Sequence, residues 1–172
     1  MPEIQYERSK IVNNMVAEKK QQIQLQNSDF LKLNGDVMEP PLLLAGLNVL
    51  VVDDDDDSRF YVTTVLEGDG ANVVAVASAA AALEALTKLQ PEVLVCDIAM
   101  PDEDGYTLIR KVRSLKPDQG GRIPAVALTA YADSEDRVRA IEAGFQTHVG
   151  KPVDPTELVE IISNLVAACQ SY

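Results

Sequence analysis

Short apolar runs alternate with helical patterns over residues 47–172. The apolar runs predict five strands, over residues 47–52, 72–77, 93–96, 125–128 and 147–149. Helical patterns between and after them predict helices near residues 58–67, 78–89, 105–115, 134–143 and 155–168. The last helix has a defined start, since Asp154 suits the N-cap, Pro155 the first helical position and Glu157 the third position after the cap.

The predicted strands are rich in Val and Leu at successive positions, which indicates a sheet covered on both faces. Five strand–helix units within residues 47–172 predict a compact α/β domain with a doubly wound, five-stranded parallel sheet. In such sheets, ligands bind outside the carboxyl ends of the strands. We therefore expect the chemistry of this protein at that edge.

The first 45 residues follow a different pattern. Residues 7–33 are polar, and their apolar positions fall only partly in helical register. Pro40 and Pro41 close the segment, because proline disfavours helix in the residue before it. We expect an N-terminal extension over residues 1–45, partly helical or disordered, and one domain over residues 46–172. A docking helix, a dimerisation helix and a disordered tail remain open for the extension.

Charge narrows the classes of partner. The chain has 172 residues and a formal net charge of −12, and 47% of its residues are hydrophobic, which excludes a wholly disordered chain. Residues 47–172 carry 10 basic and 21 acidic residues, a net charge of −11. Such a surface disfavours nucleic acid and anionic lipid. We expect neither nucleic acid nor a membrane as a partner.

Cysteine content and hydropathy indicate a cytoplasmic protein. Cys96 and Cys169 are too few for a disulfide framework and suggest reduced thiols. The first ten residues lack the apolar core of a signal peptide. The longest apolar stretch, residues 41–52, is shorter than the roughly 20 residues that span a bilayer.

Five consecutive aspartates, residues 53–57, follow the first predicted strand. A charge run is by itself typical of a solvated loop. Here, however, Asp53 and Asp54 emerge directly from a strand with a buried pattern. Adjacent carboxylates repel one another, and a divalent cation offsets that repulsion; oxygen ligands of this kind suit Mg²⁺. Asp56 and Asp57 instead fit the start of the next helix.

Three more polar residues close later strands: Asp97, Thr129 and Lys151. Taken alone, they are typical of a turn residue, a strand end and a solvated surface lysine. Together they lie at one edge of the predicted sheet. The set predicts a divalent-metal site beside a nucleophilic carboxylate, with a hydroxyl and a cation to receive phosphoryl oxygens.

Four stretches resemble the receiver domain of response regulators, the phosphorylatable proteins of two-component signalling: VLVVDDDDDSR, VLVCDIAMPDEDGYTLIRKVR, AVALTAYA and HVGKPVDP. The spacings between Asp54, Asp97, Thr129 and Lys151 also match that family. The resemblance covers about residues 45–170 and extends to receivers of hybrid histidine kinases. It implies a flavodoxin-like sheet with strand order 2-1-3-4-5.

The resemblance also implies a role for each acidic position. Asp97 would accept the phosphoryl group. Asp54 and Asp97 would bind Mg²⁺ through their carboxylates, and Ala99 would bind it through its backbone carbonyl. Asp53 would hold a metal-bound water.

The remaining site residues would bind the phosphoryl group itself. Thr129 and the backbone N–H of Ala130 would contact its oxygens, and Lys151 would pair with its charge. The peptide bond between Lys151 and Pro152 is usually cis in the family.

By the same resemblance the chain is a signalling module that promotes its own phosphorylation and dephosphorylation, not an enzyme with a separate substrate. The donor would be a histidine kinase or a histidine phosphotransfer protein. His148 stands where the family often has Tyr or Phe, so Thr129 and His148 would form a switch; His148 is equally typical of a partly exposed strand residue. The surface made by the fourth helix, fifth strand and fifth helix would form a homodimer or bind an unidentified downstream protein.

Two alternative functions stay open on the sequence. A receiver-like interaction module regulated without phosphorylation would share the fold. A phosphohydrolase of the haloacid dehalogenase type would use Asp53 and Asp55 as its first motif. That family needs an acidic metal motif after its lysine, and the acids that follow Lys151 fit the start and the face of a helix instead.

Overall fold

The computed structural model describes residues 18, 21, 40–130 and 133–171. The chain divides into two units, Met1–Leu42 and Leu43–Tyr172. The helix predicted within residues 7–33 lies outside the described residues apart from two isolated positions. The fold described below is that of the second unit.

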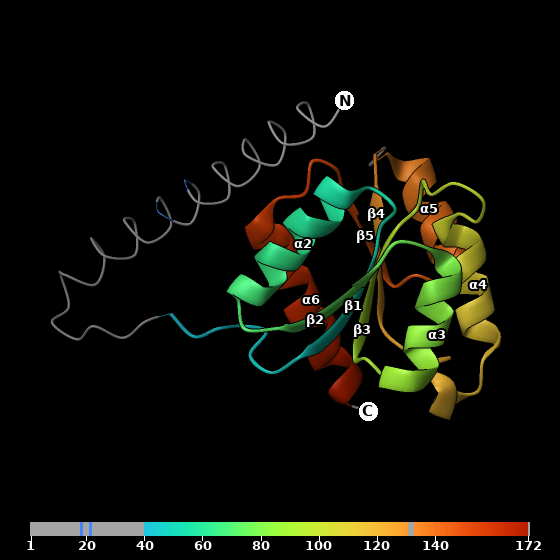
Figure 1. Cartoon of the computed structure of the whole chain (residues 1–172), viewed down its shortest axis with the longest axis horizontal. Coiled ribbons are helices and arrows are strands. Elements are labelled where there is room, and N and C mark those ends of the chain that lie inside the picture. Colours follow the sequence, from blue (N-terminus) through green and yellow to red (C-terminus); the bar gives the residue numbers. More distant parts are fainter. Residues whose placement is uncertain (1–17, 19–20, 22–39, 131–132, 172) are drawn as a thin grey trace, which may run out of the picture. The chain divides into compact units, whose positions relative to one another are not determined.

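Five parallel strands form one sheet with the order β2-β1-β3-β4-β5. The strands are β1 (Asn48–Val52), β2 (Asn72–Val76), β3 (Val93–Asp97), β4 (Ala125–Thr129) and β5 (Thr147–Gly150). Figure 1 shows the sheet between its helices, and β3 is the central strand, between β1 and β4. The α/β class, the doubly wound parallel sheet and its strand order are thus confirmed.

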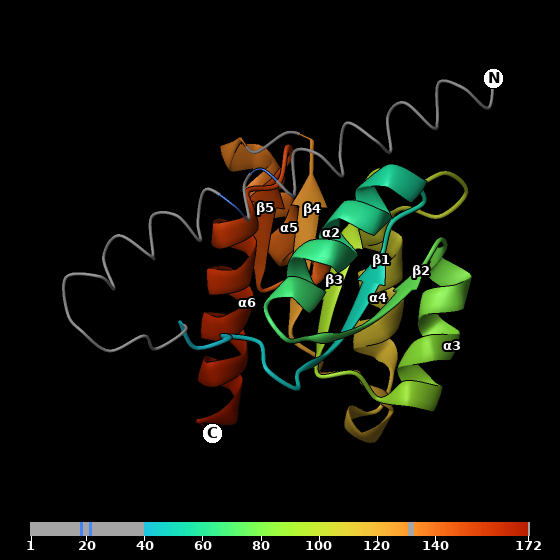
Figure 2. The same ribbon diagram turned by 60° about the vertical axis from the view of Figure 1, so that its left-hand side comes forward.

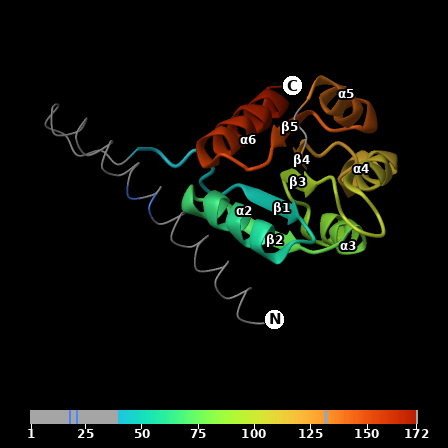
Figure 3. The same cartoon turned by 90° about the horizontal axis from the view of Figure 1, so that it is seen from above.

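Helices cover both faces of this sheet. They are α2 (Asp56–Gly68), α3 (Ala79–Leu89), α4 (Gly105–Ser114), α5 (Ser134–Ala143) and α6 (Pro155–Gln170), with the short 3₁₀ turn η1 (Pro117–Gln119). Figures 2 and 3 show α2 and α6 on one face and α3, α4 and α5 on the other. No helix among the described residues is long and apolar enough to cross a membrane.

Alternation along the strands divides the core into two clusters. Val49 and Val51 of β1 pack with the residues of α2 and α6, whereas Leu50 and Val52 pack with those of α3, α4 and α5. This is the period of two that a strand imposes on its side chains. All five residues of β3 and of β4 are buried.

The sheet is less covered at β2 than its Val-rich sequence predicts. Val74 is 42% exposed, and Asn72 and Ala75 are exposed as well. The reason is position, because β2 is an edge strand with a neighbour on one side alone. A parallel strand with an apolar sequence is fully buried only when helices reach over it.

The packed core begins before residue 46. Leu44 is 2% exposed and packs in the cluster below α2 and α6. Its N–H donates to the Asp69 carbonyl (3.2 Å), and the Gly46 N–H donates to the Gly70 carbonyl (2.9 Å). These bonds join the segment before β1 to the turn between α2 and β2.

Candidate functional site

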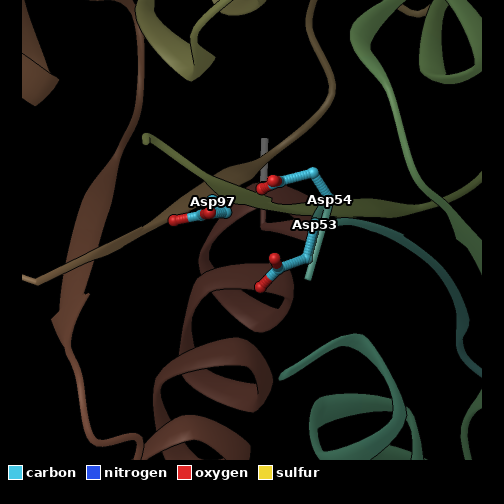
Figure 4. A group of neighbouring side chains, drawn as sticks. All are labelled: Asp53, Asp54 and Asp97. Atoms are coloured by element: carbon cyan, nitrogen blue, oxygen red, sulfur yellow. The ribbon is translucent and has the colours of Figure 1, made fainter. Parts of the chain in front are cut away.

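The ends of β1 and β3 bring three carboxylates together. One oxygen from each of Asp53, Asp54 and Asp97 can be chosen so that all three lie within 4.8 Å of one another. Figure 4 shows the side chains of Asp53 and Asp54 extending from the end of β1 toward Asp97. Asp53 is fully buried and Asp97 is 5% exposed, while Asp54 is open to solvent. The cluster therefore combines two buried charges with one accessible carboxylate.

The carboxylate of Asp53 is held from several sides. The Asp55 N–H donates to its Oδ1 (3.0 Å), and the Ser58 hydroxyl donates to its Oδ2 (2.5 Å). The Lys151 ammonium lies 3.3 Å from the same Oδ2. Asp55 itself points elsewhere, because its carboxylate caps α2 by accepting from the Ser58 N–H (2.8 Å). An Asp53–Asp55 pair of the dehalogenase type is therefore absent from the described site.

Lys151 enters the cluster from the end of β5. Its N–H donates to the Thr129 carbonyl (2.7 Å), which fixes the backbone beside β4. The Lys151–Pro152 peptide bond is cis, as the sequence resemblance implied. The Nζ atom lies 3.3 Å from Asp53 Oδ2 and 3.2 Å from Asp97 Oδ1. One cation thus bridges two carboxylates that repel each other.

The electrostatics of the cluster follow from burial and this shared cation. Burial raises the pKa of Asp97, Asp53 raises it further, and Lys151 opposes both without cancelling them. Burial alone lowers the pKa of Lys151, but its attraction to Asp53 and Asp97 outweighs burial, so the pKa stands above its usual value. Lys151 is therefore a fixed positive charge at neutral pH. Burial also raises the pKa of Cys96 well above its usual range, so this thiol stays protonated and inert.

The other predicted positions surround the cluster. Thr129 ends β4 and is 7% exposed, and Ala130 next to it is exposed. Ala99 is exposed two residues after Asp97. The Ile98 N–H donates to the Leu128 carbonyl (3.0 Å), which sets the loop after β3 beside β4. All these residues lie at the same edge of the sheet.

His148 lies inside β5, before Lys151 in the chain; it pairs with Ala127 of β4 and is half-buried. Val149 next to it faces the α2 and α6 cluster, so His148 faces the opposite side, where α5 lies.

Two residues of the site were not predicted from the sequence. Ser58 was not expected to contact Asp53, and no sequence signal pointed to it. Gly105 begins α4, and a Cβ there would lie 2.6 Å from the Asp97 carbonyl oxygen. Glycine is therefore required for α4 to start so close to Asp97. The Asp104–Gly105 pair was present in the motif, but its steric meaning depends on the packing.

The donor set suits Mg²⁺. Every candidate ligand is an oxygen, and the exposed Asp54 leaves room for water in the coordination sphere. No sulfur or imidazole ligand joins this group among the described residues, which disfavours zinc. The repulsion between the buried Asp53 and Asp97 is the kind of electrostatic cost that a divalent cation offsets.

Comparison with known proteins assigns the family. The family model of the response regulator receiver domain matches residues 49–163. A 14.6 kDa protein of Leptolyngbya boryana is 45% identical over 125 residues, which are 73% of this chain and 94% of that protein. Hybrid signal transduction histidine kinase D of Dictyostelium discoideum is 34% identical over 130 residues, which are 72% of this chain but 8% of the kinase.

Solved structures agree with the sequence relatives. The receiver domain of a sensor histidine kinase from Pseudomonas aeruginosa has a TM-score of 0.65 and 28% identity, covering 72% of this chain and 99% of that one. That structure holds a magnesium ion coordinated in its active-site cleft. The present chain belongs to the response regulator receiver domain family of two-component signalling.

Proposed function

We propose that this receiver accepts a phosphoryl group from phosphohistidine onto Asp97. The observation that carries the proposal is the placement of the Lys151 ammonium between the carboxylates of Asp53 and Asp97, 3.3 Å and 3.2 Å away. A buried carboxylate beside a fixed cation and an acidic metal-binding group provides a nucleophile and the means to neutralise an incoming phosphoryl charge.

Mg²⁺ would be held by the carboxylates of Asp54 and Asp97 and by the backbone carbonyl of Ala99. Asp53 would hold one of its waters. The proximity of the three carboxylates supports this assignment, as does the oxygen-only donor set. When bound, Mg²⁺ neutralises charge on the phosphoryl oxygens.

The chain's own groups account for the transfer. A carboxylate oxygen of Asp97 attacks phosphorus, and the new P–O bond forms as the P–N bond to the donor histidine breaks. Asp97 needs no separate base, because the ionised carboxylate is already nucleophilic. Lys151, the hydroxyl of Thr129 and the N–H of Ala130 would then bind the equatorial oxygens.

The partners follow from the same chemistry. A phosphohistidine donor is a histidine kinase or a histidine phosphotransfer protein, and one relative of this chain is a hybrid histidine kinase. The output would pass through a switch. Recruitment of Thr129 to the phosphoryl group would vacate space beside β5, and the ring of His148 would move into it.

This movement would change the surface of α5, β5 and α6. A second copy of the chain or a downstream protein would read that change.

Intact-mass measurement tests the proposal. With Mg²⁺ and a small-molecule phosphodonor, the wild-type protein should gain one acid-stable, base-labile phosphoryl group, and Asp97→Asn should gain none. Asp102→Asn is the matched control, because it makes the same change in an exposed residue of the loop that follows β3. Equal labelling of wild type and Asp97→Asn would show that the acceptor is another residue. No labelling of the wild type would favour an interaction module regulated without phosphorylation.

A further inference from the structure

We infer that Ser58 is a positioning residue of this site. Its hydroxyl holds the buried carboxylate of Asp53 in place for Mg²⁺ and continues to hold it when Lys151 turns to the phosphoryl group. The inference rests on the function proposed above and assigns to that site a residue that contacts neither the phosphoryl group nor the metal.

The position of Ser58 is set by the start of α2. Asp55 is the N-cap of this helix, and its carboxylate accepts from the Ser58 N–H at 2.8 Å. With the backbone anchored, the Ser58 hydroxyl reaches back to Asp53 Oδ2 at 2.5 Å. The next residue, Arg59, donates to the Asp53 carbonyl oxygen at 2.8 Å. The first turn of α2 thus holds both the side chain and the backbone of Asp53.

Asp53 needs these donors because it is fully buried. A buried carboxylate that lacks hydrogen bonds is strongly unfavourable. Its partners differ in kind: Lys151 is a cation shared with Asp97, whereas the Asp55 N–H and the Ser58 hydroxyl are neutral and local. Of these partners, Lys151 is the one whose position would depend on whether Asp97 is phosphorylated.

Phosphorylation of Asp97 would change the group that the Lys151 ammonium contacts. The ammonium would follow the added negative charge, and its contact with Asp53 Oδ2 would weaken. Ser58 bonds to that same oxygen. A neutral hydroxyl can hold Oδ2 without drawing Lys151 back or repelling the metal. Without it, the Asp53 carboxylate would turn toward Lys151, and both metal binding and phosphoryl transfer would suffer.

A purely structural role makes a different prediction. Serine in the first turn of a helix is common, and its loss would then lower stability alone. The distinguishing quantity is the affinity for Mg²⁺, because outer hydrogen-bond partners of metal-binding residues typically contribute about 10–100-fold to metal affinity or activity.

The experiment uses the full chain and three variants. Ser58→Ala removes the hydroxyl, and Ser58→Thr retains it. Thr64→Ala is the matched control. It removes a hydroxyl of the same helix, and that hydroxyl donates to the Phe60 carbonyl (2.8 Å) instead of to a carboxylate of the cluster. Calorimetric titration with Mg²⁺ alone gives the affinity, labelling at saturating Mg²⁺ gives the transfer rate, and a thermal melt with a chelator reports folding.

The expected result is that Ser58→Ala binds Mg²⁺ about tenfold more weakly and labels more slowly even at saturating Mg²⁺. Ser58→Thr should stay within about twofold of the wild type, as should Thr64→Ala. An Mg²⁺ affinity of Ser58→Ala that is unchanged or tighter would overturn the inference, and so would a failure of Ser58→Thr to restore it. If Ser58→Ala unfolds, an Mg²⁺ affinity of Ser58→Thr that falls more than about twofold below the wild type would still overturn the inference. A wild type that binds Mg²⁺ but cannot be labelled would instead contradict the proposed function, while the titrations still decide the role of Ser58 in metal binding.

Discussion

The two edges of the sheet surround their charged side chains with different kinds of neighbour. At the amino ends of β4 and β5, the guanidinium of Arg113 donates to the Gly144 carbonyl (2.9 Å), the Gly121 carbonyl (3.0 Å) and Gln146 Oε1 (3.1 Å). Gln146 Oε1 in turn accepts from the N–H of Ala125, the first residue of β4 (2.7 Å). Every acceptor is neutral, and the three acceptors lie in the two loops that precede β4 and β5.

The carboxyl ends of β1 and β3 carry like charges instead. Asp53 and Asp97 share one cation, and their repulsion together with burial raises the pKa of Asp97. The geometry around Arg113 favours one arrangement, because each of the three guanidinium nitrogens donates to an acceptor. At the carboxyl ends of β1 and β3, repulsion between Asp53 and Asp97 remains, and under the proposed function a metal ion or an added phosphoryl group would change it. The proposal therefore places stabilising contacts and the phosphorylation site at opposite edges of one sheet.

The largest expected effect is the loss of Mg²⁺ binding when an aspartate that follows β1 is removed. Asp54→Ala should weaken Mg²⁺ binding by about a hundredfold and nearly abolish labelling, because it removes an accessible ligand. Asp57→Ala should change the Mg²⁺ affinity little, since Asp57 lies in the first turn of α2. Titration of both variants with Mg²⁺ checks this, and a stronger effect of Asp57→Ala would contradict the assigned site.

The second-largest expected effect is on the stability of the fold, at the amino ends of β4 and β5. Arg113→Ala should lower the free energy of unfolding by about 2–3 kcal/mol, because it leaves the carbonyls of Gly121 and Gly144 without their donor. Arg110→Ala, an exposed arginine of the same helix, should stay within about 0.5 kcal/mol of the wild type. Urea unfolding measures both. Below the melting temperature, Arg113→Ala should be labelled normally; loss of labelling would mean that the two edges are coupled.

A smaller effect on stability is expected at Asp97, where a substitution should stabilise the protein and not destabilise it. Because its pKa is raised in the folded protein, stability is lost as pH rises through that pKa. Without Mg²⁺ at neutral pH, Asp97→Asn should therefore melt about 2–4 °C above the wild type. This gain should shrink on acidification, since the wild-type carboxyl is then protonated. A lower melting temperature of Asp97→Asn would show that the ion pair with Lys151 outweighs the repulsion.

The smallest effect is expected at His148. His148→Ala should leave labelling of Asp97 within about twofold of the wild type, because the residue lies outside the cluster. It should reduce the phosphorylation-dependent change in self-association, whereas His148→Tyr should retain that change. Sedimentation with and without the phosphodonor measures it. Thr147→Ala is the control on the same strand, and equal responses of all variants would place the switch elsewhere.

The order of apolar and polar residues along the chain was enough to predict the sheet, the helices and which polar residues lie together at the ends of the strands. Short apolar runs predicted each of the five strands to within one residue of its observed ends. The sequence alone placed Asp53, Asp97, Thr129 and Lys151 together, because the carboxyl ends of parallel strands meet at one edge of the sheet. Local order along the chain was sufficient for that inference.

Which atoms contact one another depends instead on how the elements pack. The exposure of Val74 depends on β2 being an edge strand, and the burial of Leu44 depends on α2 and α6 closing over it. The hydrogen bond from Ser58 to Asp53 depends on where α2 starts. The contact between Lys151 and Asp53 joins two residues that are 98 positions apart in the chain. Periodicity reports which face of an element is apolar, whereas a hydrogen bond between distant residues exists only once the packed elements bring donor and acceptor within about 3 Å.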